Sequence, residues 1–148
     1  MPTGYGMRPD GDYLPWSWAE ERLVRSRTYW IASTRPDGRP HVTPVWYDFD
    51  GRDFTVATFR NAQKLENVSR KGFAALCIFT QEPPYRNVII EGTARLGSPL
   101  DNVWRERLAA RYLGEHAGRV YVQETADWDV IAIHIRPQHW TCTGFSDS

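Results

Sequence analysis

The sequence has no excess of charge of either sign. Its 148 residues include 18 basic and 18 acidic side chains, which gives a formal net charge of +0, and no long run of one sign is present. A protein that holds nucleic acid through the phosphate backbone usually presents a basic stripe. We therefore expect no nucleic-acid partner.

Long hydrophobic runs are also missing. No stretch of the sequence is apolar over the roughly 18 residues that suggest a membrane-spanning helix, and the N-terminus shows no signal-peptide pattern. The sequence therefore predicts a cytoplasmic protein with no membrane partner.

Cysteine and histidine are scarce. The two cysteines, Cys77 and Cys142, lie in separate strand-like segments without a C-x-x-C pair, so we expect two reduced thiols in the core. His116, His134 and His139 are scattered, with no acidic residue at metal-ligand spacing. The sequence predicts no metal site.

What is present is a series of strand-like segments. The length predicts one domain over residues 15–148, preceded by an extended Gly- and Pro-rich arm over 1–14. Apolar or alternating runs predict strands over 28–34, 41–49, 53–59, 73–80, 87–96, 128–136 and 139–144. Helical patterns cover 15–27, 61–71 and 98–113. Strands outweigh helices and short turns join them, so the predicted fold is mainly β: an antiparallel, closed or half-open barrel of six to seven strands, with two to three helices outside.

The third helix carries its own boundary signals. Ser98 is expected to cap it and Gly114 to end it. Its predicted apolar stripe consists of Leu100, Val103, Trp104, Leu108 and Tyr112. Beyond it, Pro137 is expected to separate the last two strands, because proline cannot donate to a sheet.

The segment "ATFRNAQKLENV" (57–68) places two cations around a helix start. A helix N-terminus is partly positive, and its free N–H groups bind phosphate. Arg60 and Lys64 would add charge-assisted hydrogen bonds and Thr58 a hydroxyl, so the segment is typical of a phosphate site at the end of a strand. The alternatives are that both cations are simply solvated or that Lys64 pairs with Glu66.

Pro44 lies inside a predicted strand, in "HVTPVW" (41–46). Its missing N–H interrupts the hydrogen-bond ladder, which marks an edge or a bulge. Backbone groups beside it are then free to face a flat heteroaromatic ring. The alternative is an ordinary edge strand.

Three segments, "YWIASTRPDGRPHVTPVWYDFDG", "FTVATFRNAQKLENVSRKGFAAL" and "IIEGTARL", resemble the pyridoxamine 5′-phosphate oxidase-like superfamily. Within it, the resemblance is closest to small flavin- and deazaflavin-dependent oxidoreductases, and it spans roughly residues 16 to 145. It implies a split β-barrel homodimer with two cofactor sites at the subunit interface.

The resemblance also implies which residues bind the cofactor. The ring would lie against Thr43, Pro44, Val45 and Trp46, and the phosphate would meet Thr58, Arg60, Lys64 and Asn67. Further candidates are His41, Asn61, Tyr85 and Trp140, the last two lining the pocket of the same or the partner chain. Relatives often have Ser two residues before the lysine; here it is Ala62, and Arg60 or Asn61 is expected to substitute.

The expected cofactor is coenzyme F420, with FMN second. F420 adds an acidic tail beyond the phosphate, for which Arg60, Arg70, Lys71 and Arg86 are candidate partners. The expected activity is hydride transfer to or from an unsaturated small molecule, with the cofactor supplying the chemistry. No G-x-S-x-G motif or nucleophile set is present. Catalytic residues stay open, with His41, Tyr47 and Tyr85 as candidate proton donors.

Three alternatives fall outside an F420 enzyme. The first is an FMN-binding oxidoreductase of the same superfamily. The second is a non-catalytic flavin or F420 carrier, or a flavin-dependent sensor. The third is a split barrel that has lost its ligand.

Overall fold

The computed structural model describes residues 16–23, 28–83 and 85–144, so the arm predicted for 1–14 lies outside the described residues. The elements are α1 (Trp16–Leu23), β1 (Thr28–Thr34), β2 (Pro40–Pro44), β3 (Tyr47–Phe49), β4 (Phe54–Phe59), α2 (Gln63–Lys71), β5 (Phe73–Phe79), β6 (Arg86–Pro99), α3 (Asn102–Leu113), α4 (Glu115–Glu124) and β7 (Val130–Gly144). The described strands form one antiparallel sheet in the order β2-β1-β5-β6-β7-β4-β3. The prediction of a mainly β, antiparallel fold is confirmed.

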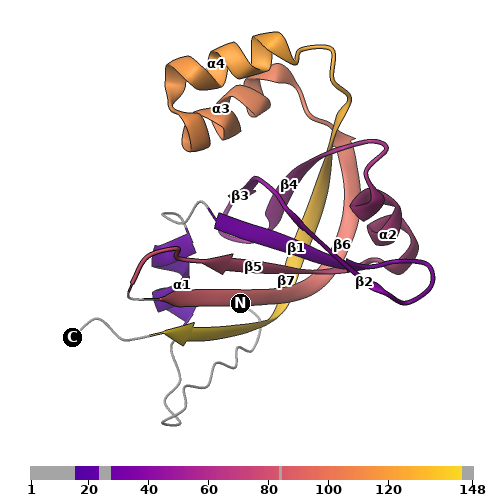
Figure 1. Ribbon diagram of the computed structural model, residues 1–148, viewed down its shortest axis with the longest axis vertical. Coiled ribbons are helices and arrows are strands. Elements are labelled where there is room, and N and C mark those ends of the chain that lie inside the picture. Colours follow the sequence, from indigo (N-terminus) through magenta and orange to yellow (C-terminus); the bar gives the residue numbers. More distant parts are fainter. Residues whose placement is uncertain (1–15, 24–27, 84, 145–148) are drawn as a thin grey trace.

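The sheet curls into a half-barrel because its two edge strands are neighbours in the sequence (Figure 1). Only Val45 and Trp46 separate β2 from β3. The N–H of Val45 donates to the carbonyl of Tyr29 in β1 over 3.4 Å, and the N–H of Ala57 in β4 donates to the carbonyl of Trp46 over 3.4 Å. This two-residue crossing therefore ties the two ends of the sheet together.

The inner face of the half-barrel is the hydrophobic core. Alternation in β4 buries Phe54, Val56 and Thr58, as the sequence predicts. The fully buried large side chains also include Ile31, Tyr47, Leu76, Ile90, Ile133 and Ile135. Thr58 ends this inward-facing row, so a hydroxyl lies where the apolar row stops.

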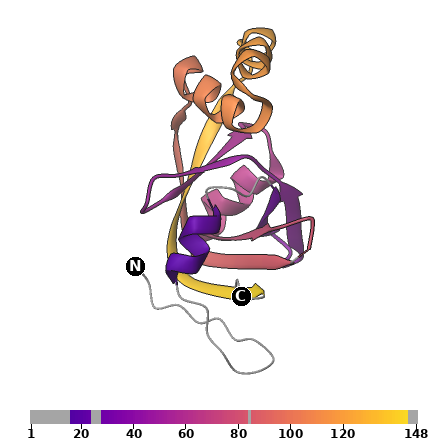
Figure 2. The same ribbon diagram turned by 90° about the vertical axis from the view of Figure 1, so that its left-hand side faces the viewer.

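The helices lie outside the sheet. Figures 1 and 2 both show α3 and α4 side by side at one end of the half-barrel, beyond β3 and β4. The close packing of α3 on α4 depends on Gly118, where an added Cβ would lie 2.7 Å from the backbone nitrogen of Ala110. None of the described helices is long and apolar enough to span a membrane.

The predicted strand over 41–49 is interrupted. β2 ends at Pro44, and β3 begins only at Tyr47. The expected edge position of Pro44 is confirmed, because β2 pairs with β1 alone. At the crossing the chain passes from one edge strand of the sheet to the other, so the backbone of Val45 and Trp46 lies outside both strands.

The predicted break at Pro137 is wrong. β7 runs unbroken from Val130 to Gly144, and a register shift lets Gly92 face Pro137 while Glu91 faces His139. The bulge accommodates the proline without ending the strand. It requires a glycine opposite, because a Cβ on Gly92 would lie 1.8 Å from the carbonyl oxygen of Arg136.

The predicted start of the third helix is also wrong. β6 continues through Ser98 and Pro99, and α3 begins at Asn102, where the Asp101 side chain accepts from the N–H of Trp104 over 2.8 Å. Asp101 is therefore the N-cap in place of Ser98, whereas Gly114, at φ +88°, ends the helix as expected.

The helix α4 was not predicted, so the described residues contain four helices instead of two to three. Its presence changes which face of α3 is buried. Of the predicted stripe, Leu108 is buried and Leu100, Trp104 and Tyr112 are partly buried, but Val103 is 79% exposed. Arg105 and Ala109, outside the stripe, are buried. Ala109 and Ala110 of α3 pack against Gly118 of α4, and Val103 faces solvent.

Candidate functional site

A cavity of ≈ 530 Å³ lies beside the Val45–Trp46 crossing. Its lining residues come from β1, the end of β2, the crossing, the end of β4, α2, the segment after β5, α3, α4 and the start of β7: Tyr29, Trp30, Pro44, Val45, Trp46, Ala57, Thr58, Phe59, Lys64, Gln81, Arg105, Leu108, Tyr121 and Val130. Five residues predicted for the cofactor site are in this set, namely Pro44, Val45, Trp46, Thr58 and Lys64. The fold therefore brings the predicted ring and phosphate segments to one cavity.

Thr58 and Lys64 are the polar groups on the β4–α2 side of the cavity. The Oγ1 atom of Thr58 is buried and has no hydrogen-bond partner in the described part of the chain, in a residue that is 3% exposed. Lys64 is partly buried and makes no salt bridge or hydrogen bond with any described residue, so the predicted alternative of a Lys64–Glu66 pair is absent from this part of the chain. Burial lowers the pKa of Lys64 below its ordinary value. A buried donor and an unpaired cation beside it form a site that an anion would satisfy.

The start of α2 adds backbone donors to this region. Ala62 is the N-cap, with φ −72° and ψ 140°, and makes no side-chain cap bond. The first N–H groups of a helix lack partners within the helix. Because Ala62 supplies no capping oxygen, the positive end of α2, with Lys64 in its first turn, is left for an incoming anion.

Arg60 lies at the edge of this region and is already paired. Its side chain forms a two-bond ion pair with Asp129, which raises the pKa of Arg60. Both side chains are more than half exposed. Of the two cations around the start of α2, Lys64 lines the cavity, whereas Arg60 joins the β4–α2 turn to Asp129, just before β7.

Asn67 is fully buried, one helical turn after Lys64. Its Nδ2 donates to Oγ of Ser33 over 3.0 Å, and its Oδ1 accepts from Nε2 of Gln63 over 2.9 Å. These bonds fasten α2 to β1, so Asn67 sets the position of the helix start that carries Lys64.

The remaining predicted residues lie around the cavity or away from it. His41 has a buried Nδ1 without a partner, and its pKa is lowered by desolvation and then by the charges of Arg35 and Lys64. Thr43 donates to the carbonyl of Pro44 over 3.4 Å. Asn61 and Tyr85 are exposed, and Trp140 is buried in the core beside Trp16, with ring centroids 5.4 Å apart.

The opposite wall of the cavity is aromatic. The ring of Trp46 stacks on Tyr112 of α3, with centroids 4.9 Å apart and planes 6° apart, and lies 5.3 Å from the ring of Tyr121 of α4. The crossing segment is thereby locked to both outer helices. A planar ligand at this wall would meet aromatic faces and edges.

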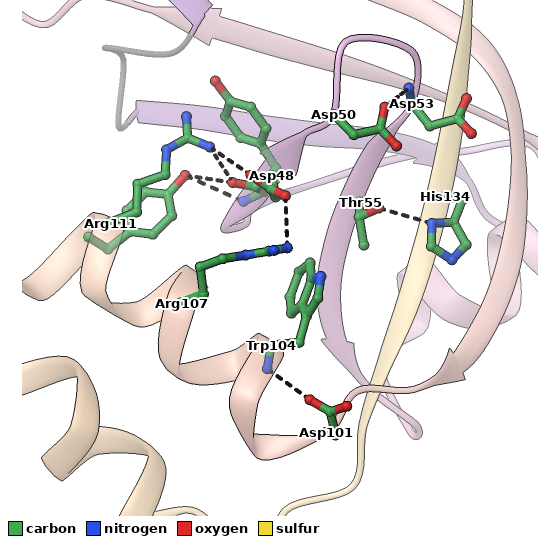
Figure 3. A network of polar contacts seen from close by, with 11 residues as sticks. Asp48, Asp50, Asp53, Thr55, Asp101, Trp104, Arg107, Arg111 and His134 are labelled. Atoms are coloured by element: carbon green, nitrogen blue, oxygen red, sulfur yellow. Dashed lines mark hydrogen bonds and ion pairs between the residues drawn. The ribbon is translucent and has the colours of Figure 1, made fainter. Parts of the chain in front are cut away.

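Polar contacts from α3 to β3 hold this wall in place, as Figure 3 shows. Arg107 and Arg111 both reach the carboxylate of Asp48, at 3.4 and 3.9 Å, and Arg111 donates to the carbonyl of Tyr47 over 2.8 Å. These contacts join α3 to β3.

The sequence reading missed Arg105, Leu108 and Tyr121 as cavity residues. Arg105 and Leu108 are three positions apart on α3 and so share a face. An arginine on the buried face of a helix was the available signal. The sequence alone did not show that this face of α3 is buried, because α4, which packs on it, was not predicted.

Comparison with known proteins agrees with this fold. The family model described as pyridoxamine 5′-phosphate oxidase matches residues 18–143. None of the curated proteins matches the chain significantly.

Among solved structures, a conserved hypothetical protein from Mycobacterium tuberculosis matches with a TM-score of 0.72 and 22% identity, over 93% of this chain and 89% of that one. An F420 reductase matches with a TM-score of 0.67 and 24% identity, over 82% and 94%. HutZ, the heme storage protein of Vibrio cholerae, matches with a TM-score of 0.63 and 16% identity, over 90% and 95%. At these identities the similarity shows a shared fold. The names of the last two neighbours refer to different ligands, F420 and heme.

Proposed function

The chain belongs to the pyridoxamine 5′-phosphate oxidase family, and from this premise we propose that it is an oxidoreductase using coenzyme F420. The proposed reaction is hydride transfer to or from an unsaturated small molecule. FMN is the second candidate cofactor.

The observation that carries the proposal is the pair formed by Thr58 and Lys64. A buried hydroxyl without a partner and a partly buried ammonium without a counter-ion line one cavity at a helix start. Each is costly without a ligand, because a buried polar group or charge needs a partner. A phosphate would satisfy both through charge-assisted hydrogen bonds.

The ring of the cofactor is proposed to lie along the crossing. Pro44, Val45 and Trp46 line the cavity where the ladder of β2 ends, so backbone groups there can read the polar edge of a flat ring. When bound, the cofactor would supply the hydride chemistry. The side chains of Ala57, Phe59 and Val130 would exclude water from the ring.

Two features favour F420 over FMN. One of the structural neighbours is an F420 reductase. In addition, Arg70 and Lys71 are exposed in the last turn of α2, where an acidic tail leaving the phosphate could meet them. Among the described residues Arg70 bonds only the backbone carbonyl of Thr34, so its charge stays available.

We also propose that the protein is a homodimer with a cofactor site at each end of the interface. Trp30 and Phe59 line the cavity and are still 38% and 44% exposed, and Val42 of the edge strand β2 is 57% exposed. A second copy would bury these side chains. Light scattering during size exclusion tests the assembly, and a monomer at micromolar concentration would contradict it.

A parallel titration with F420 and FMN tests the cofactor assignment. The wild type should bind F420 more tightly, and Thr58→Val, which keeps the side-chain shape, should weaken binding of either cofactor about fivefold to tenfold, the equivalent of one hydrogen bond. Thr55→Val is the matched control, because Thr55 lies on the opposite face of the same strand, bonded to His134. Failure of the wild type to bind either cofactor would reject the proposal. Binding without turnover in any substrate screen would favour a carrier.

A further inference from the structure

We propose that the cavity holds a second anion-binding position at Arg105, which makes the substrate an organic acid with a flat apolar body. This inference rests on the proposed function, because it names the substrate class of the same cavity. The carboxylate would pair with the guanidinium, and the apolar body would lie against Leu108 and Tyr121.

Arg105 is a buried cation that faces the cavity. Its residue is 6% exposed, and it lines the cavity from α3, on a different element from Lys64. Its Nη1 donates to the carbonyl of Thr125 over 3.0 Å and to Oδ1 of Asn102 over 3.4 Å, and its Nη2 donates to Oγ1 of Thr125 over 2.6 Å. All three acceptors are neutral.

The missing carboxylate distinguishes Arg105 from two other arginines that join elements of this fold, Arg136 and Arg111. Arg136 pairs with Asp53 over 2.7 Å, and Arg111 approaches Asp48 over 3.9 Å. No described acidic side chain forms an ion pair with Arg105. A buried charge without a counter-ion is unfavourable unless a ligand supplies the opposite charge. A guanidinium has five N–H donors, of which three are used here, so two stay available for a ligand.

The surroundings of Arg105 restrict the kind of anion. Leu108, Tyr121 and Val130 form the adjacent lining, and Trp46 is held beside them by its stacking on Tyr112. A fully hydrated inorganic anion gains nothing from these apolar faces. A carboxylate on an aromatic or conjugated body gains both the paired hydrogen bonds of a guanidinium and the apolar contact.

The competing explanation is purely structural: Arg105 joins α3 to the end of α4 through Thr125 and has no ligand. The two explanations differ in what happens to ligand discrimination when the charge is removed. The test therefore measures the preference for an acid over its amide, with fold stability followed separately by thermal melting.

The probes are naphthalene-2-carboxylate and naphthalene-2-carboxamide, which share one flat body. Binding is followed in the NMR spectrum through the indole N–H signals of Trp30 and Trp46, because both side chains line the cavity. The wild type should bind the carboxylate at least about tenfold more tightly, as expected for a charged hydrogen bond. Arg105→Gln should abolish this preference. Equal affinities in the wild type, or an unchanged preference in Arg105→Gln, would overturn the proposal.

Three variants keep the result unambiguous. Arg119→Gln removes an exposed charge from the neighbouring helix α4 and should keep the preference. Thr125→Val removes the hydroxyl acceptor but not the guanidinium; it should lower the melting temperature and keep the preference, and loss of the preference would show a structural role. Should Arg105→Gln not fold, Arg105→Lys should weaken the preference, because an ammonium cannot form the paired bonds; an unweakened preference would overturn the proposal.

The proposed function and this inference can fail separately. If the preference disappears in Lys64→Met but not in Arg105→Gln, the acid occupies the phosphate position and the Arg105 proposal is wrong. If the wild type prefers the carboxylate but binds neither F420 nor FMN, the anion position stands and the oxidoreductase assignment falls.

Discussion

The two lysines of this chain offer a sharp test, because both lie on α2 and only one lines the cavity. Lys64 is in the first turn and faces the cavity, whereas Lys71 is in the last turn and is exposed. Replacing either by Met removes the same charge and keeps a good helix former. The two substitutions should nevertheless shift the melting temperature in opposite directions without cofactor. They should also differ in how much added cofactor raises the melting temperature.

Without cofactor, Lys64→Met should melt at the same temperature as the wild type or higher. A cation in the first turn opposes the helix dipole by about 0.3–1 kcal/mol, and the same cation in the last turn gains a similar amount. At about 2–4 °C per kcal/mol for a domain of this size, Lys64→Met should gain up to about 4 °C and Lys71→Met should lose up to about 4 °C.

With cofactor, the wild type should melt at a higher temperature than Lys64→Met. The lost charged hydrogen bond contributes about 1.5–3 kcal/mol, so Kd should rise about 10–100-fold in Lys64→Met. At about 100 times the wild-type Kd, the ligand stabilises the wild type by about 2.7 kcal/mol, but Lys64→Met by only about 0.4–1.4 kcal/mol. The melting temperature should therefore rise by about 5–11 °C in the wild type and by half of that or less in Lys64→Met.

Differential scanning fluorimetry across a cofactor titration measures both effects, and Lys71→Met should show the wild-type rise with FMN, which has no acidic tail. The reasoning is refuted if Lys64→Met melts lower than the wild type without cofactor and retains the full rise with it. The ammonium would then stabilise the protein itself and not the ligand.

Three further predictions follow from the same contacts. Because burial lowers the pKa of Lys64, cofactor affinity should fall at a pH below the ordinary lysine value of 10.5, and Lys64→Arg should retain affinity to higher pH. In the ligand-free protein the native state then binds fewer protons than the unfolded state between the lowered pKa and 10.5, so the Lys64 contribution to stability rises with pH across that window, as denaturant titrations of the wild type and Lys64→Met would show. Asn67→Ala removes the bonds to Ser33 and Gln63 and should cost about 1–3 kcal/mol of unfolding free energy; a variant that loses cofactor affinity at unchanged stability would contradict this and favour direct phosphate contact. Gly92→Ala forces a Cβ against the backbone of Arg136 and should cost more than about 3 kcal/mol in urea unfolding, whereas Gly97→Ala meets side-chain atoms of His134 and Ala132 and no backbone and should cost less, and equal costs would show that the bulge is not rigid.

Local chemistry in the sequence was enough to predict much of this protein. The alternation of Phe54, Val56 and Thr58 fixed the inner face of β4, and Pro44 marked an edge strand, because both effects act between residues that are close in the chain. The placement of Lys64 at the first turn of α2 was predictable for the same reason.

Other features depended on what packs where, which no local pattern contains. Pro137 stays within β7 because Gly92, far away in the sequence, leaves room for a bulge. Val103 is exposed and Arg105 is buried because the packing of α3 on α4 covers Leu108 of the predicted stripe together with Arg105 and Ala109, on the side away from Val103.

The sequence by itself determined an antiparallel β domain of this family and a cationic helix start after β4. Tertiary structure alone decided which cation of this helix start lines the cavity. Arg60 forms an ion pair with Asp129, 69 residues later in the chain, whereas Lys64 has no partner among the described residues. The physical reason is that a charge finds its partner through space, and the sheet order that brings β7 beside β4 is set by the curl of the entire sheet.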